Sequence, residues 1–600
     1  MNWIKERIKH CLDAHECASH AVSPFLPTRV IYVGTSPDDI RLVETDRKLA
    51  ASYVCLSHCW GKETPLKTTK ETLAANLASL SWSQIPRTYQ EAITVTRCLG
   101  IEYLWVDSLC IIQDDNDDWA RESAEMCNVY EHAYLTIAAT AAKSAKDGLF
   151  MHAQRARFSM TGSTPEQPFR VMALGACHHP SFLTHHILPP IWPLLQRAWV
   201  FQERFLSPRV VHFCDQEVLW ECREQALCEC GFMTNRSTLG KMGYNKVLNQ
   251  QEPARIQQLW QEMVERYSPL SLSFGADKLP ALAGLARQVS RKRPGARYLA
   301  GLWSDSMDAD LLWLSTHEDS GRPSMWRAPS WSWASIDGSV TLPLGMWRHS
   351  PLEERRNELV SSYYTLVEVT TSPLALDEMG GIASASLTIE GIAFPAVLTR
   401  AVADESAEEP TERHWKLRIL EGEDNLALVP TTCHDVPPLE QRSEQQHAPK
   451  FVSKLRRAAL SLRERRGKKA AARGDEDARV LFLHPSQDED EHQLCLDNTQ
   501  EPLFDRALDT LETTMEETVL CVRMGRARHM RSPPADSIME MEYAMILQHT
   551  NDRSRYRRIG MITQKRESKE PEDLADPARM WRASPSCLEK GGKKITVTII

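Results

Sequence analysis

Two apolar runs with a polar segment between them, in residues 102–140, constrain the fold more than any other part of the chain. The first run, Tyr103–Ile112, is interrupted by only two polar residues, and the second, Leu135–Ala139, is short and apolar. Runs of this kind are typical of parallel strands that helices cover on both faces. The segment between them has apolar residues at three- and four-residue spacing, and Asp117 or Asp118 can cap it as a helix. The stretch therefore predicts a β-α-β crossover.

Polar side chains gather where two of the predicted strands end. A third apolar run, Tyr53–Leu56, is typical of a buried strand. It leads into a turn of sequence SHCWG at residues 57–61. In open α/β sheets, ligands bind at the carboxyl ends of the strands. We therefore expect a ligand site formed by polar residues of the two strand ends: Ser57, Trp60, Gly61, Asp107, Ser108 and Gln113.

The turn at residues 57–61 also contains a hydroxyl, an imidazole and a thiol, which together suggest a nucleophile. Adjacent residues of a strand point to opposite faces, however, so Ser57 and His58 cannot easily pair as a dyad. We interpret the turn as ligand-facing or structural instead.

A helix is predicted between the two strands, over Ile85–Leu99. Pro86 suits a first helical position, and Gly100 suits the C-terminal cap. Two shorter strand-like pieces, Arg29–Val33 and Ile40–Val43, precede this region and are typical of a hairpin. The order of strand, helix, strand, helix and strand predicts a parallel sheet wound with helices.

A second dense stretch covers residues 196–222. It predicts a helix over Arg197–Leu206, followed by a hairpin of Val210–Cys214 and Val218–Trp220. This short stretch is rich in charged and polar residues, which either form a buried polar network or line a pocket. These residues are Arg197, Gln202, Glu203, Arg204 and Arg209, and we take Arg197 and Glu203 as candidate ligand-binding residues.

Composition narrows the possible partners. The formal net charge of −9 argues against nucleic-acid binding by the protein as a whole. No run of about eighteen apolar residues occurs, and the N-terminus has no apolar core of a signal peptide, so we expect no membrane association and a cytoplasmic location. The 16 cysteines are then expected to be reduced.

Histidines and cysteines raise the possibility of a metal site at three places. They are Cys11, His15 and Cys17; Cys222, Cys228 and Cys230; and the paired histidines His178, His179, His185 and His186. None of the three groups has a standard ligand spacing for zinc. We therefore predict no metal ion, with a helix that packs on the main domain at the first place and a polar loop at the last.

Changes in composition and hydrophobic pattern along the chain suggest four parts. They are an N-terminal helix and hairpin (1–50), the α/β domain (51–230), a helical extension (231–350) and a mostly β region (351–600). The class is therefore α+β overall. An insertion at about 435–479 carries eight basic residues between positions 454 and 469 and is expected to be solvated and disordered. A nuclear targeting role for this basic run is the alternative.

Several motifs together resemble the fungal heterokaryon incompatibility (HET) domain. The resemblance rests on YVCLSHCWG at 53–61, the stretch from IPRTYQEA to LTIAAT at 85–140, GLF at 148–150 and RAWVFQERFLSPRVVHF at 197–213. Weaker similarities follow at 276–286, 298–303, 328–335 and 556–560. The resemblance implies a fungal intracellular protein that triggers cell death after the fusion of genetically different hyphae. It also implies an unidentified protein partner or self-association.

The HET domain has been considered a distant relative of TIR domains, some of which cleave NAD. That relation implies a TIR-like sheet and a carboxylate near the ribose, which stabilises an oxocarbenium-like state. A TIR-like enzyme would have its glutamate on a helix comparable to the one that follows the strand at Tyr103, which makes Glu122 the candidate catalytic residue and Glu125 the alternate.

No glycine-rich phosphate loop is present, so no bound cofactor is expected and NAD would be a substrate. The alternatives to an enzyme are a non-catalytic signalling module and a nuclear interaction protein.

Overall fold

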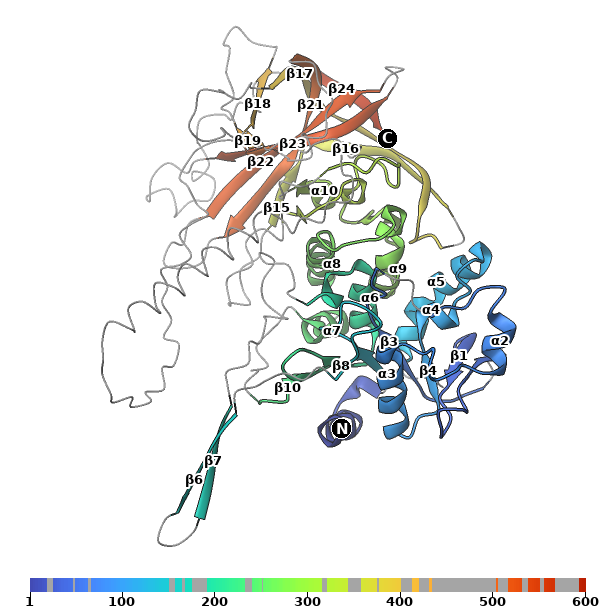
Figure 1. Cartoon of the computed structure of the whole chain (residues 1–600). Helices are drawn as coiled ribbons and strands as arrows, with labels where there is room; N and C mark the ends of the chain where they lie inside the picture. Colours follow the sequence, from blue (N-terminus) through green and yellow to red (C-terminus); the bar gives the residue numbers. More distant parts are fainter. Residues whose placement is uncertain are drawn as a thin grey trace, which may run out of the picture.

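A computed structural model gives the fold of most of the chain (Figure 1). It describes residues 1–18, 25–46, 49–62, 66–150, 157–163, 168–174, 192–231, 240–250, 252–315, 321–343, 358–374, 377–400, 413–419, 431–433, 503–504, 516–530, 538–550, 555–566 and 593–600. The basic insertion at 435–479 and the paired histidines at 178–186 lie outside these residues.

An 8-stranded sheet forms the N-terminal part, in the order β10-β9-β8-β5-β3-β4-β1-β2. Its four central strands, β8, β5, β3 and β4, are parallel, and the two at each edge are antiparallel. The strands are β1 (Arg29–Tyr32), β2 (Arg41–Glu44), β3 (Tyr53–Ser57), β4 (Tyr103–Trp105), β5 (Leu135–Ala138), β8 (Arg209–Phe213), β9 (Val218–Cys222) and β10 (Ala226–Cys228). The sheet is therefore mixed rather than wholly parallel as predicted: its central strands are parallel, and both predicted hairpins extend its edges.

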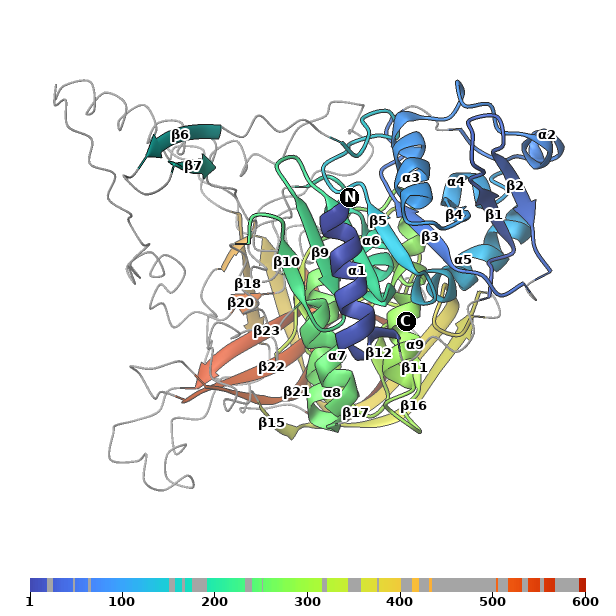
Figure 2. The same cartoon turned by 90° about the horizontal axis from the view of Figure 1, so that it is seen from below.

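Helices connect the parallel strands in the predicted order. They are α3 (Arg87–Cys98) between β3 and β4, α5 (Asn116–Glu131) between β4 and β5, and α6 (Ala198–Leu206) between β5 and β8. The direction of winding reverses at β3, so right-handed crossovers put α3 on one face and α5 and α6 on the other. Figure 2 shows this two-sided cover, and α5 contacts α6. Two further helices are α1 (Asn2–Ala14) and α2 (Leu73–Ala78).

The predicted strand at Tyr103–Ile112 is shorter than expected. β4 ends at Trp105, and residues Asp107–Cys110 form a helical turn, α4. The Asp107 carboxylate explains the change, because its Oδ1 accepts a hydrogen bond from the backbone N–H of Ser108 at 2.7 Å. An acidic side chain in a first helical turn satisfies backbone donors that a strand would leave for a neighbouring strand.

The N-terminal cap of α5 also differs from the prediction. Asp115 caps the helix, and its side chain accepts hydrogen bonds from the backbone N–H groups of Asp117 and Asp118. The carboxylate of Asp118 instead turns inward to the buried guanidinium of Arg29. At the end of α3, Gly100 has φ +74°, the left-handed conformation that a C-terminal cap favours, as predicted.

A helical layer follows the sheet and is built around buried tryptophans. Its main helices are α7 (Lys241–Gln250), α8 (Pro253–Tyr267), α9 (Ala283–Ser290) and α10 (Met307–Asp310). The indoles of Trp260 and Trp333 both donate to the carbonyl of Gly301, each at 3.0 Å. Two small two-stranded sheets complete the layer: β11 (Tyr298–Leu299) with β12 (Leu302–Trp303), and β13 (Leu314–Ser315) with β14 (Val340–Thr341).

The C-terminal part is a 10-stranded sheet that closes on itself into a small barrel, because β17 pairs with both β21 and β24. Its strands are β15 (Glu358–Ser362), β16 (Tyr364–Pro373), β17 (Ile382–Arg400), β18 (Arg413–Ile419), β19 (Thr431–Cys433), β20 (Leu503–Phe504), β21 (Glu516–Met530), β22 (Ile538–His549), β23 (Tyr556–Arg566) and β24 (Lys593–Ile599). A separate hairpin, β6 (Arg157–Ser163) with β7 (Pro168–Leu174), precedes α6.

The barrel lies against the helical layer (Figure 1). A buried arginine contributes to this contact. Arg558 of β23 donates from its guanidinium to the carbonyls of Leu311 and Trp313, and its Cζ lies 3.6 Å from the Trp313 ring centroid. The structure therefore has an α/β sheet, helices and a β region in chain order, which is an α+β class. No helix of the described residues is apolar and long enough to cross a membrane.

Candidate functional site

The parallel strands define where a ligand site is expected. Their spatial order, β4-β3-β5-β8, places the first strand of the unit in the second position, as in doubly wound sheets of flavodoxin type. Ligands of such sheets bind outside the carboxyl ends of the strands, where the direction of winding reverses. In this chain that point lies between β3 and β5, and the turn at residues 57–61 follows β3 directly.

A chain of buried hydrogen bonds begins at His58 in this turn. The His58 Nε2 atom lies 2.7 Å from the hydroxyl of Tyr89 on α3, and that hydroxyl lies 2.9 Å from Oγ of Ser108 on α4. All three side chains are buried. Burial lowers the pKa of His58 to about 4, and the nearby Asp107 carboxylate opposes this shift only in part. The imidazole is therefore neutral at physiological pH and can accept or donate a hydrogen bond.

Asp107 lies between the buried histidine and the protein surface. Its Oδ2 accepts a hydrogen bond from the indole Nε1 of Trp60 at 2.9 Å, and its Oδ1 lies 3.8 Å from Nδ1 of His58. The Asp107 side chain is 24% exposed, whereas that of His58 is 1% exposed. A solvent-facing carboxylate is therefore linked to a buried neutral imidazole.

Arg197 joins the start of α6 to the turn after β3. Its guanidinium donates a hydrogen bond to the backbone carbonyl of His58. This half-buried cation also opposes the effect of burial on the pKa of the Cys59 thiol, which is raised. The site therefore combines a cation, a carboxylate and a neutral imidazole.

Glu203 is a buried carboxyl group from the middle of α6. Burial raises its pKa to about 7, and the hydroxyls of Ser57 and Tyr130 and the charge of Arg197 oppose this shift. The negative charge of Asp107 acts in the same direction as burial. A carboxyl group with a pKa near neutrality can exchange a proton at physiological pH, which is the property of a general acid or base.

Two other predicted residues shape the edge through the backbone. Gly61 has φ +86°, and a Cβ there would lie 2.6 Å from Cβ of Ser144, so the turns after β3 and β5 approach closely. Gln113 donates from Nε2 to the carbonyls of Asp107 and Ile111, at 3.1 and 3.0 Å. Gln113 therefore holds the α4 turn in place.

The structure brings together all eight predicted ligand-binding residues and adds two that were not predicted for the site. The assembled set is Ser57, Trp60, Gly61, Asp107, Ser108, Gln113, Arg197 and Glu203, and the additions are His58 and Tyr89. Tyr89 lies in the predicted helix at Ile85–Leu99, and its hydroxyl was the only signal in the sequence, because a buried tyrosine usually finds a polar partner.

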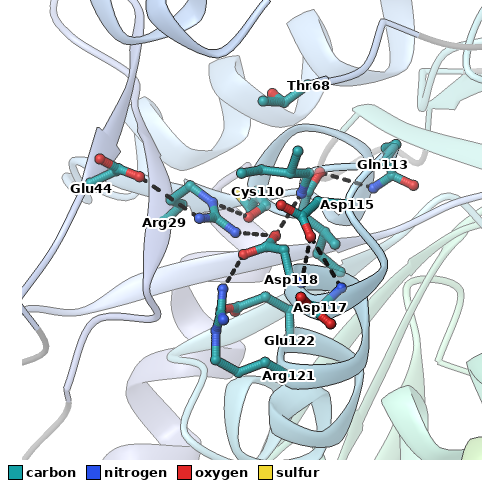
Figure 3. Close-up of polar contacts among 12 residues, drawn as sticks. Arg29, Glu44, Thr68, Cys110, Gln113, Asp115, Asp117, Asp118, Arg121 and Glu122 are labelled. Carbon is teal, nitrogen blue, oxygen red and sulfur yellow. Dashed lines mark hydrogen bonds and ion pairs between the residues drawn. The ribbon is translucent and has the colours of Figure 1, made fainter. Parts of the chain in front are cut away.

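Glu122 lies in a different group of charged residues (Figure 3). It is buried on α5, with Oε1 3.5 Å from Nε of Arg121. Arg121 also pairs with Asp118, whose carboxylate pairs with Arg29 of β1 and accepts from the backbone of Ile112. The alternate candidate, Glu125, is half-buried and accepts a hydrogen bond from Asn128 at 3.1 Å.

The other charged residues of the second dense stretch form a buried network, as one of the two predictions stated. Arg204 donates to both carboxylate oxygens of Glu221, at 2.7 and 2.8 Å, and His212 lies 3.5 Å from the same carboxylate. The carbonyl of Tyr134 accepts from Arg209 at 2.8 Å. The pairing with Arg204 holds the pKa of Glu221 well below its usual range, despite burial.

Neither of the two groups of potential metal ligands in the described part of the chain includes a residue of the His58–Asp107–Glu203 cluster.

A comparison with protein families supports the resemblance of the motifs. The family model described as heterokaryon incompatibility protein (HET) matches residues 53–203, from the first residue of β3 to Glu203 of α6. The matched range contains every residue of the cluster described above. No curated protein and no solved structure matches the chain.

Proposed function

We propose that this chain, which carries a HET domain at residues 53–203, is an effector of cell death in fungal non-self recognition. The observation that carries the proposal is that the matched residues assemble one polar cluster at the carboxyl edge of the sheet. Asp107 and Trp60 connect this cluster to the surface, and His58 and Glu203 form its buried part.

The chemistry of the cluster supports a functional site rather than a purely structural part of the core. Burying an imidazole and a carboxyl group costs free energy, and burial accounts for the largest part of the pKa shifts of both His58 and Glu203. Perturbed groups at a sheet edge where ligands bind are typical of functional sites.

Inducible expression in a filamentous fungus tests the proposal. We expect the unmodified chain to cause growth arrest and uptake of a vital dye, and Asp107→Asn or Glu203→Gln to reduce both at equal protein level. Glu71→Gln, which changes an exposed carboxyl group outside the cluster, is the matched control and should retain full activity. Undiminished death with both cluster variants would sink the proposed site, and the absence of death with the unmodified chain would sink the effector role.

NAD cleavage is the second candidate function, and the position of Glu203 favours it. Breaking the bond between nicotinamide and C1′ of the ribose releases nicotinamide and leaves an oxocarbenium-like ribose, which water attacks with loss of a proton. Glu203 shares the sheet edge with Ser57 and Arg197, so it can stabilise that state or take the proton. Arg197 supplies a cation for the diphosphate of the substrate.

Glu122 remains the competing candidate for the carboxylate, since α5 precedes β5 and lies on the same face as α6. Nicotinamide release by the purified chain separates the two. If Glu203 acts, Glu203→Gln abolishes release and Glu122→Gln reduces it only as far as it destabilises the protein. If the unmodified chain releases no nicotinamide, NAD cleavage is ruled out, and a non-catalytic signalling module is the alternative.

A signalling role requires a protein partner or self-association. Light scattering during size-exclusion chromatography tests self-association, which predicts a mass above the 68.2 kDa of one chain. We also propose a cytoplasmic location, with nuclear import through the basic run at 454–469 as the alternative. Unchanged localisation after deletion of residues 450–473 would rule out that alternative.

A further inference from the structure

Four potential metal ligands from distant parts of the sequence meet beside the N-terminal helix. They are Cys11, His15, Cys17 and Cys222. One ligand atom from each, a sulfur or an imidazole nitrogen, lies within 4.8 Å of every other. No zinc site is predicted here from the sequence, because three ligands in one short segment match no standard spacing. The fourth ligand comes from β9, which the chain reaches only after the whole HET domain.

The local backbone of the N-terminal segment directs three ligands to one side. Cys11 lies in the last turns of α1, and His15 follows the helix in extended conformation with its N–H bonded to the carbonyl of Cys11. Cys17 then lies in a 3-10 turn, Glu16–Ala18. The backbone N–H of Glu16 donates to the carboxylate of Glu224 at 2.6 Å, which fastens this segment to the loop after β9.

We propose that Cys11, His15, Cys17 and Cys222 bind one structural Zn²⁺ ion. Tetrahedral zinc with bonds of about 2.3 Å to sulfur and about 2.0 Å to nitrogen requires ligand atoms roughly 3.5–3.8 Å apart. The distance between Sγ of Cys222 and Nδ1 of His15 is 3.4 Å. Three thiolates and one imidazole are an established ligand set for structural zinc.

Burial supports a site that is closed to solvent. Cys11 and Cys222 are fully buried, Cys17 is 2% exposed, and His15 alone is half-buried. Four protein ligands complete the coordination of the ion and leave no position for water or substrate, which is the arrangement of a structural rather than a catalytic zinc. Binding displaces the thiol protons to solvent, because the thiolate is the ligand.

A cation lies next to the proposed ligands. Arg209, the first residue of β8, has NH1 4.0 Å from Sγ of Cys11 and donates from Nε to the carbonyl of Tyr134. Three thiolates with one Zn²⁺ carry a net negative charge, and a buried guanidinium offsets it. Outer groups of this kind orient metal ligands and tune the affinity of the site.

The location indicates what the ion would do. Cys222 pairs with Arg209 at the amino end of β8, so the site lies at the edge of the sheet opposite to the His58–Asp107 cluster. Figure 2 shows α1 beside β9, and the ion would fasten this helix to the sheet. The role is therefore to secure residues 1–18 and independent of the chemistry proposed for the HET domain.

Metal analysis of the purified full-length chain tests the proposal. We expect one zinc ion per chain after purification without chelator, and bands of tetrahedral Co²⁺ with thiolate ligands after cobalt replaces zinc. Cys222→Ser and His15→Ala should each lower zinc occupancy at least about tenfold at a fixed chelator concentration. Cys98→Ser, which changes an exposed cysteine, is the matched control and should keep the zinc.

A second variant set excludes the other group of potential ligands, Glu217, Cys228 and Cys230. The double variant Cys228→Ser and Cys230→Ser should keep the zinc if the proposal holds. His15→Ala serves where Cys222→Ser does not fold, because the half-buried imidazole is the mildest ligand to remove. Hydrogen exchange in residues 2–18 should rise on chelation, and this measurement needs no variant.

Three results would overturn the proposal. The first is a wild-type chain that contains no zinc and takes up none when zinc is supplied under reducing conditions. The second is zinc that persists in His15→Ala and Cys222→Ser but is lost in the double variant Cys228→Ser and Cys230→Ser. The third is a disulfide between two of the three cysteines in protein prepared from a reducing cytoplasm, which would remove the ligands.

Discussion

The indole of Trp60 donates a hydrogen bond to the carboxylate of Asp107 at 2.9 Å, and this bond joins the carboxyl ends of two neighbouring parallel strands. Trp60 follows β3 and Asp107 follows β4, so the bond sets the separation of the two turns. The same carboxylate also accepts from the N–H of Ser108, which begins the α4 turn. One side chain therefore both ends a strand and orients the site.

Trp60→Phe should lower the free energy of unfolding by about 1 kcal/mol, because it removes a hydrogen bond to a charged group that water can partly replace. Urea denaturation measures this change. Trp119→Phe, which alters an exposed tryptophan on α5, is the control and should have almost no effect. Equal effects of the two variants would show that the Asp107 contact contributes nothing to stability.

Tyr89→Phe should cost more, about 2 kcal/mol, because it leaves buried polar atoms of both His58 and Ser108 without their shared partner. The measurement is again urea denaturation. Tyr103→Phe removes the hydroxyl of a half-buried tyrosine and provides the comparison. A smaller loss for Tyr89→Phe than for this control would contradict the hydrogen-bond chain.

Glu203→Gln should stabilise the protein at alkaline pH and not at acidic pH. The folded-state pKa of Glu203 is raised from 4.5 to about 7, so the folded chain holds a proton that the unfolded chain releases in this interval. The contribution of Glu203 to the free energy of unfolding of the unmodified chain is therefore fully present below pH 4.5. It is lost as the pH rises to about 7. The glutamine side chain of the variant does not titrate, so the variant does not lose stability in this pH interval.

The difference in free energy of unfolding between Glu203→Gln and the unmodified chain should become more favourable to the variant by about 3 kcal/mol between pH 4 and pH 8. Urea denaturation of both proteins at the two pH values measures it, and effects of all other groups cancel. A difference that is independent of pH would mean that the carboxyl group titrates normally.

Asp118→Asn should lower the free energy of unfolding by about 3 kcal/mol, because it leaves the guanidinium of Arg29 buried without its closest counter-charge. The side chains of Arg29 and Asp118 are 4% and 3% exposed. Glu44 also lies near Arg29, at 3.8 Å, but is 53% exposed, so Glu44→Gln should cost less than about 1 kcal/mol. Similar losses for the two variants would contradict the importance of burial.

Local patterns in the sequence predicted the N-terminal sheet well, because most of its helices and strands follow one another in the chain. The apolar runs at Tyr53 and Leu135 became central strands, and Gly100 capped its helix. The predicted strand at Tyr103 was too long at its C-terminal end. A hydrophobic pattern does not distinguish a buried strand from the buried helical turn that Asp107 starts.

Contacts between distant segments could not be predicted from local patterns. Nothing in the sequence near Cys11 points to Cys222, and nothing near Asp118 points to Arg29. Polar residues with ordinary spacing acquire their roles only when the fold brings a second segment to them. The same holds for Glu122 and Glu203, two glutamates on helices that look alike until their neighbours are known.

The closure of the C-terminal barrel affects how the chain must be made. β17 pairs over Leu387–Ala393 with β24, which the ribosome makes after the other strands of the barrel, and Ile600 accepts hydrogen bonds from Ser330 in the helical layer. A chain that stops before Lys593 would leave unpaired strand edges on β17 and β23, and such edges template aggregation. Loss of β24 would therefore leave the N-terminal sheet intact but attached to a region prone to aggregation.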